Sequence, residues 1–121
     1  MKLIYTFTTG LMKVHLIKRQ TIIRYVINNA QSRNSFSLWT GILKKADWNV
    51  PQDIMATYGS ANILGGGTER VVFNIGGNKY RMICRFHFGD KRVHLFVNWI
   101  GTHSEYAMLC KEGKQYNISN Y

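Results

Sequence analysis

Apolar residues recur at helical spacing through the first half of the chain. A short apolar run over 14–17 predicts a strand. The stretches 19–29 and 34–47 each gather their apolar residues on one helical face, which predicts two amphipathic helices. The residues that we expect to be buried are Ile22, Ile23, Val26 and Ile27 in the first helix and Leu38, Trp39, Ile42, Leu43 and Ala46 in the second. Pro51 suits the start of a further short helix over 52–58.

The pattern changes to alternation from Arg70 onward. Strands over 70–75 and 79–88 flank Gly76-Gly77-Asn78, whose residues accept the positive φ of a hairpin turn. On the second strand Tyr80, Met82, Cys84, Phe86 and Phe88 point one way, and Lys79, Arg81, Ile83, Arg85 and His87 point the other. A third strand over 93–100 is apolar on both faces, which indicates an interior position in the sheet.

A short helix follows the third strand. Thr102 and Glu105 have the spacing of a capping box, in which the side chains of both residues bond the free backbone amides of a helix start. We therefore expect both residues to serve as a structural cap. Helices, then an antiparallel meander, then one short helix make an α+β fold, with the N-terminal helices packed on a small twisted sheet.

The length of 121 residues fits one domain. We assign 12–110 to that domain, 1–11 to an N-terminal extension that precedes an alternative start at Met12, and 111–121 to a flexible polar tail. The glycine-rich stretch 59–68 lacks the Gly-Lys-Ser/Thr signature of a phosphate loop and is expected to be a connector.

Several protein classes are disfavoured by composition. No apolar run is long enough for a transmembrane helix, so we expect no membrane partner. Cys84 and Cys110 have neither a metal-ligand spacing nor an evident disulfide role, which suits a reducing cytoplasm. The six acidic residues are scattered, so we expect no metal site and no cofactor.

The charge of the chain points to an anionic partner. Sixteen Lys and Arg oppose six Asp and Glu, which gives a net charge of +10. A small protein this basic favours nucleic acid, an anionic membrane or an acidic protein partner. The unpaired cations on one strand face, with Arg70 on the neighbouring strand, predict a surface that binds successive phosphates.

A second cluster of candidate residues stands at the start of the final helix. The free amides of a helix N-terminus can hold a phosphate, and His103 stands among them with Tyr106 one turn further. Histidine, tyrosine and a row of Arg and Lys are sufficient for RNA cleavage without a metal. His87 is an alternative proton acceptor, whereas His15 and His94 are expected to be structural.

Three segments together resemble the HigB toxin family. They are KKADW at 44–48, RVVFNIGGNKYR at 70–81 and IGTHSEY at 100–106, and the resemblance runs from about Met12 to Leu109. The family is similar in fold to the RelE and ParE toxins. The resemblance implies an mRNA endonuclease that acts on the translating ribosome. It also implies a cognate helix-turn-helix antitoxin, through whose complex alone the toxin would reach operator DNA.

The resemblance also suggests which residues carry the activity. The family's motif positions fall on Asn74, Asn78, Lys79, Arg81, His103, Glu105 and Tyr106. Catalytic roles are expected for Lys79, Arg81, His103 and Tyr106. RNA binding is expected from Arg70, Asn74, Asn78, Arg85 and His87.

Three other functions fit parts of the same pattern. A ParE-like gyrase inhibitor would keep the fold and change the target, since fold alone does not decide function. A non-enzymatic nucleic-acid-binding module would need only the basic row and aromatic residues for stacking. A partner-binding protein would use its charge to meet an acidic chain.

Overall fold

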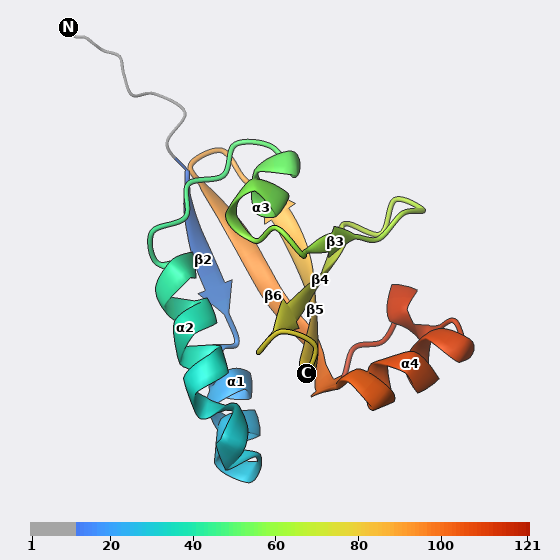
Figure 1. Cartoon of the computed structure of the whole chain (residues 1–121). Coiled ribbons are helices and arrows are strands. Elements are labelled where there is room, and N and C mark those ends of the chain that lie inside the picture. The colour runs from blue at the N-terminus through green and yellow to red at the C-terminus, as the bar shows by residue number, and fades with distance from the viewer. Residues whose placement is uncertain (1–11) are drawn as a thin grey trace, which may run out of the picture.

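A five-stranded sheet with helices on both faces forms the protein, seen here as a computed structural model that describes residues 12–121 (Figure 1). The strands are β2 (Lys13–Ile17), β3 (Asn62–Ile63), β4 (Arg70–Ile75), β5 (Tyr80–Phe88) and β6 (Arg92–Thr102). The helices are α1 (Arg19–Asn28), α2 (Arg33–Leu43), α3 (Gln52–Thr57) and α4 (His103–Lys111), with 3-10 turns η1 (Ala30–Ser32) and η2 (Lys114–Tyr116). The α+β class expected from the sequence is confirmed, while the extension assigned to 1–11 lies outside the described residues.

The strand order is β2-β6-β5-β4-β3. Strands β4, β5 and β6 form the predicted antiparallel meander, and β6 is an interior strand as expected. Gly76 and Gly77 have φ values of 66° and 68° in the turn between β4 and β5, a conformation that glycine adopts readily. Strand β2 pairs in parallel with β6, and the stretch predicted as a plain connector contains β3.

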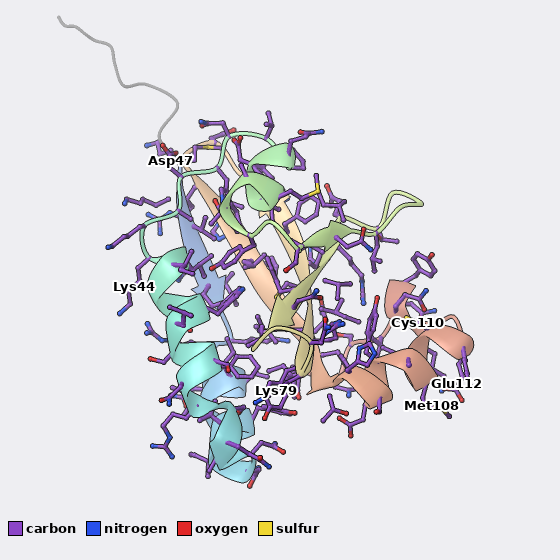
Figure 2. The ribbon with its side chains drawn as sticks, viewed as in Figure 1. Lys44, Asp47, Lys79, Met108, Cys110 and Glu112 are labelled. Atoms are coloured by element: carbon purple, nitrogen blue, oxygen red, sulfur yellow. The ribbon has the colours of Figure 1, made fainter. Side chains whose placement is uncertain are left out.

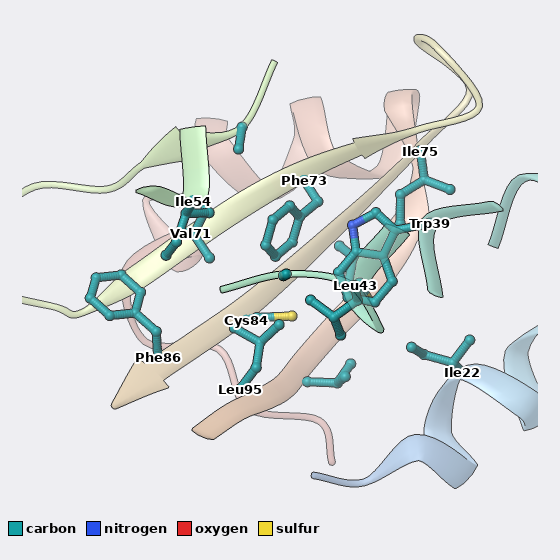
Figure 3. Close-up of a cluster of buried hydrophobic side chains, with 14 of the residues drawn as sticks. Ile22, Trp39, Leu43, Ile54, Val71, Phe73, Ile75, Cys84, Phe86 and Leu95 are labelled. Carbon is teal, nitrogen blue, oxygen red and sulfur yellow. The ribbon is translucent and has the colours of Figure 1, made fainter. Parts of the chain in front are cut away.

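The main core lies between the sheet and helices α1, α2 and α3. Figure 3 shows Trp39 and Leu43 of α2 directed toward Phe73 and Cys84 of the sheet. Trp48 is fully buried, and its indole N–H donates a hydrogen bond of 2.8 Å to the Thr57 hydroxyl. The apolar face predicted for β5 is the face that builds this core.

Two helices bury less than their sequence pattern predicted. Ile27 of α1 and Leu38 of α2 are 68% and 67% exposed, and Ile23 and Ile42 are also exposed. Only one row of side chains on each helix is buried against the sheet, and in α1 that row is centred on Ile22. In α2 the buried residues are Phe36, Trp39 and Leu43. Ile23 and Ile27 line an open groove between α1 and α2, whereas Leu38 and Ile42 line a separate hollow beside the turn between β4 and β5.

A second, smaller core covers the opposite face of the sheet. It consists of Leu64, Val72, Ile83, Trp99 and Leu109, with Tyr106 and Ile118 packed against it. Helix α4 lies on this side of the sheet, away from α1 and α2 (Figure 1). The second core therefore covers the middle of the cationic face, which was expected to be open to solvent. Arg70 and Arg81 are each only 8% exposed.

The C-terminal segment differs from the loose tail that was predicted. After α4 the chain forms η2 and returns to the sheet, where Ile118 joins the second core. The Arg70 guanidinium donates hydrogen bonds to the carbonyl oxygens of Gln115 (3.3 Å) and Ile118 (2.7 Å). The amide of Asn120 donates to the carbonyl of Asn98 over 2.9 Å. Ile118, the buried Arg70 and the Asn120 amide together connect the segment to the sheet.

None of the helices in the described part of the chain has the length and apolar character needed to cross a membrane.

Candidate active site

The start of α4 is fixed by a complete capping box. The Glu105 amide donates a hydrogen bond of 3.2 Å to Thr102 Oγ1, and the Thr102 amide donates one of 2.7 Å to Glu105 Oε1. Both side chains are therefore engaged in the helix start, as the sequence pattern predicted. The first turn of α4, which carries His103 and Tyr106, is held at a defined position by these two bonds.

The first residue of α4 is tied to the start of β5. The His103 amide donates a hydrogen bond of 3.0 Å to the Lys79 carbonyl, and Arg81 stands opposite Gly101 in the sheet. Figure 2 shows Lys79 at the hairpin beside the beginning of α4. Lys79 and His103 are exposed. Lys79, Arg81, His103 and Tyr106 therefore come from adjoining elements at one end of the sheet, and we name this group the candidate active site.

Arg81 provides a largely buried cation at this site. Its Nη1 donates a hydrogen bond of 3.1 Å to the Tyr80 carbonyl, and its strand neighbour on β4 is Asn74. A guanidinium in a partly dry environment interacts more strongly with an anion than one in water does. Among residues 12–121 no carboxylate forms a salt bridge with Arg81.

Tyr106 packs against Trp99 with the ring centroids 6.1 Å apart. Burial and the neighbouring Cys110 thiol raise the pKa of Tyr106 well above its usual value, although the nearby Arg81 charge lowers it somewhat. The phenol therefore stays protonated at neutral pH. In that state Tyr106 can donate a hydrogen bond or a proton, and it is unsuited to act as a base.

Gly101 allows the sheet and α4 to approach each other closely. A Cβ at this position would lie 2.4 Å from the Trp99 ring and 2.9 Å from Glu105 Oε1. The absence of a side chain at Gly101 thus leaves room for the tryptophan that supports Tyr106. The sequence analysis gave Trp99 no role beside Tyr106. Its position two residues before Gly101 on an interior strand could have indicated that its ring packs over the glycine.

The residues predicted to bind RNA separate into two groups. Asn74 lies opposite Arg81, and Asn78 is in the turn that precedes Lys79, so both belong to the candidate active site. Arg70, Arg85 and His87 lie beyond the second core, at the other end of the same face. Arg81 and Arg85 are four residues apart, which corresponds to roughly 14 Å along a strand.

The candidate active site contains cations, a histidine and a protonated phenol, but few carboxylates. Within residues 12–121 no group of three or more His, Cys, Asp or Glu side chains is placed to hold a metal ion. Glu105, the acidic residue nearest to His103 along the chain, is already engaged in the capping box. This combination suits proton transfer and the stabilisation of negative charge on phosphorus.

Comparison with known proteins identifies the family. Residues 32–109, which include the candidate active site, match the profile of HigB_toxin, described as the RelE-like toxic component of a toxin-antitoxin system. The chain belongs to the HigB toxin family. The resemblance noted from the sequence motifs is therefore confirmed, and a cognate antitoxin is the partner that such a family implies.

A curated relative within the same group is the mRNA interferase HigB of Escherichia coli O6:H1. The two proteins are 27% identical over 70 residues, which cover 58% of this chain and 66% of the relative. The chain thus spans just under two thirds of the length of that HigB protein.

Proposed function

We propose that this HigB-family chain is an endoribonuclease that cuts messenger RNA on the translating ribosome. The observation that carries the proposal is that Lys79, Arg81, His103 and Tyr106 lie on adjoining elements at one end of the sheet. The His103 backbone amide joins these elements by donating a hydrogen bond to the Lys79 carbonyl. The activity named for the Escherichia coli relative supports messenger RNA as the substrate.

Cleavage without a metal requires three events. The 2′-hydroxyl loses its proton and its oxygen attacks the phosphorus. The negative charge of the resulting phosphorane is stabilised by nearby donors and cations. The bond to the 5′-oxygen then breaks and that oxygen gains a proton, which leaves a 2′,3′-cyclic phosphate and a 5′-hydroxyl.

Each of these three events can be assigned to a residue of the candidate active site from the chemistry of its side chain. Tyr106 stays protonated, so His103 takes the proton of the 2′-hydroxyl. Tyr106 orients the substrate or donates a hydrogen bond to the leaving oxygen. Arg81 and Lys79 stabilise the phosphorane, and Asn74 and Asn78 hold the adjoining phosphate or sugar groups.

The proposed activity needs two partners. The catalytic groups are few and lie on one side of the protein, so we expect them to need a substrate that is already oriented. The translating ribosome holds the message in such a geometry. The antitoxin is a helix-turn-helix protein, and its complex with the toxin binds operator DNA. Co-expression of that antitoxin is expected to restore growth to cells that make the toxin.

The test is to induce the chain briefly in bacteria and map new mRNA 5′ ends. Arg81→Ala is expected to reduce cleavage by about 10²–10³-fold, which is the typical loss when one charge-stabilising donor is removed. Because Arg81 is largely buried, Arg81→Lys is measured beside it and is expected to retain part of the activity. Lys45→Ala, an exposed charge on the helical side, is the matched control and should cleave like the parent.

The outcomes separate the proposed function from its alternatives. New ends within translated regions that disappear when translation is blocked would support the proposal. A folded Arg81→Ala variant that cleaves like the parent would refute it. Growth arrest with DNA damage and no new ends would indicate a ParE-like gyrase inhibitor, and RNA binding with no new ends would indicate a binding module.

A further inference from the structure

Three histidines form a row across three neighbouring strands, on the sheet face that also carries Arg81. His15 of β2 pairs in register with His94 of β6, and His94 pairs with His87 of β5. The ring centroids of His15 and His94 are 5.9 Å apart, and those of His87 and His94 are 6.2 Å apart with the planes inclined by only 19°. His15 and His87 are exposed, so this imidazole row is open to solvent.

The neighbouring row places an arginine on an aromatic ring. Arg85 of β5 pairs with Phe96 of β6, and the Arg85 guanidinium carbon lies 4.3 Å from the centroid of the Phe96 ring. The Phe96 and His94 rings are also neighbours, with centroids 6.4 Å apart. A guanidinium within cation–π distance of one ring can also stack on an unpaired base, which is a common way for proteins to hold single-stranded RNA.

The surroundings of these two rows are cationic. On β2 and β6 the next pair in register is Lys13 and Arg92, and on β4 the partner of Arg85 is Arg70. Burial and then the charge of Arg85 lower the pKa of Arg70, so the two guanidinium groups repel each other. Over the described residues neither arginine has a carboxylate within salt-bridge distance. This concentration of charge without acidic partners favours an anion on the surface.

We propose that the imidazole row (His15, His94 and His87) and the Arg85–Phe96 stack form a platform for single-stranded RNA. The proposal rests on the proposed function, and it assigns the strand as the part of the message that extends beyond the cleaved bond. Unpaired bases stack on the imidazoles and on the Arg85 guanidinium, while Arg85, Lys13 and Arg92 neutralise phosphates. The platform lies on the same sheet face as the candidate active site, on the far side of the second core.

This proposal gives His15 and His94 a role in RNA binding that the sequence did not predict. His15 and His94 were expected from the sequence to be structural. Their neighbourhood depends on the parallel pairing of β2 with β6, which has no local sequence signal. His15 is the most specific test of the platform, because it belongs to an edge strand that contributes no residue to the candidate active site.

The test measures binding without cleavage. The full chain is titrated into a fluorescently labelled 2′-O-methyl oligoadenylate of twelve nucleotides, which cannot be cleaved, and anisotropy is recorded at several salt concentrations. Arg85→Lys keeps the charge and loses the planar stacking surface. It is expected to weaken binding about tenfold with little change in the salt dependence. Arg85→Ala should weaken binding further and flatten the salt dependence.

Two further variants complete the set. His15→Ala is expected to weaken binding several-fold, and Lys45→Ala, on the helical side, should bind like the parent. Equal affinity of the parent, Arg85→Lys and His15→Ala would overturn the platform.

The result is distinguishable from failure of the proposed function. Binding that depends on Arg85 and His15, in a chain that produces no new mRNA ends, would retain the platform and reject the nuclease. New mRNA ends together with unaltered binding by both variants would retain the nuclease and reject the platform.

Discussion

The guanidinium of Arg70 donates a hydrogen bond of 2.7 Å to the carbonyl of Ile118, which joins the first residue of β4 to the final residues of the chain. Ile118 also packs on the second core. The end of the chain is thus part of the folded domain, and it covers the middle of the sheet face that carries the candidate active site.

Replacement of Ile118 is therefore expected to destabilise the whole fold. Ile118→Ala should lower the free energy of unfolding by about 1–2 kcal/mol, below the range for a fully buried isoleucine because the side chain remains partly exposed. Urea denaturation followed by circular dichroism would measure the difference. Asn117→Ala, an exposed neighbour, should change stability little, and equal stability of parent and Ile118→Ala would show that the segment is not anchored.

The capping box gives a prediction that separates structure from catalysis at Glu105. Thr102→Ala should lower the free energy of unfolding by about 1 kcal/mol, whereas Thr102→Ser should preserve it, because serine offers the same hydroxyl. Glu105→Gln should keep both stability and cleavage, since its amide oxygen still accepts from the Thr102 amide. Loss of cleavage in a stable Glu105→Gln variant would give the carboxylate a chemical role.

Two glycines should respond in opposite ways to alanine. Gly101→Ala would place a methyl group against the Trp99 ring and should cost about 1–3 kcal/mol through overpacking. Gly41 lies within α2 with no neighbouring atom within 4 Å of a Cβ, so Gly41→Ala should stabilise the protein by about 0.5–1 kcal/mol. Thermal unfolding of both variants would test the pair. An unchanged melting temperature for Gly101→Ala would mean that Trp99 moves freely.

Alkaline pH should lower the free energy of unfolding, because the Tyr25 phenol then ionises more readily in the unfolded chain than in the folded one. Burial, followed by the charge of Glu105, raises the pKa of Tyr25 from 10.0 to about 12. The folded state thus favours the neutral phenol, so this contribution to stability is complete below pH 10 and is lost as the pH rises toward 12. Tyr25→Phe cannot ionise. Its melting temperature should fall less than that of the parent between pH 9 and pH 11.5, and parallel curves would contradict the assignment.

The sequence predicted directions of side chains better than their burial. Alternation on β5 placed Met82 and Arg81 on opposite faces, as observed, because a strand's geometry is local. The burial of Arg70 depends on the returning C-terminal segment, which no local pattern reveals. The exposure of Leu38 has the same origin, since helical spacing shows which residues share a face but not how wide a stripe the sheet accepts.

The grouping of the candidate active-site residues could be predicted because it depends on segments that are close in the sequence. Thr102 and Glu105 carry a motif whose geometry is contained in four residues, and the pairing of β5 with β6 across a short turn brings Arg81 near that motif. The imidazole row was missed because the pairing of His15 with His94 joins segments that are far apart in the sequence.

The parallel pairing of β2 with β6 also sets an order on the assembly of the sheet during synthesis. Among the described strands β2 is made first, but its strand partner β6 is made last. A nascent chain that still lacks β6 lacks the strand that pairs with all of β2, and long-range pairing of this kind forms slowly. β2 is therefore joined to the sheet only after β6 has been made.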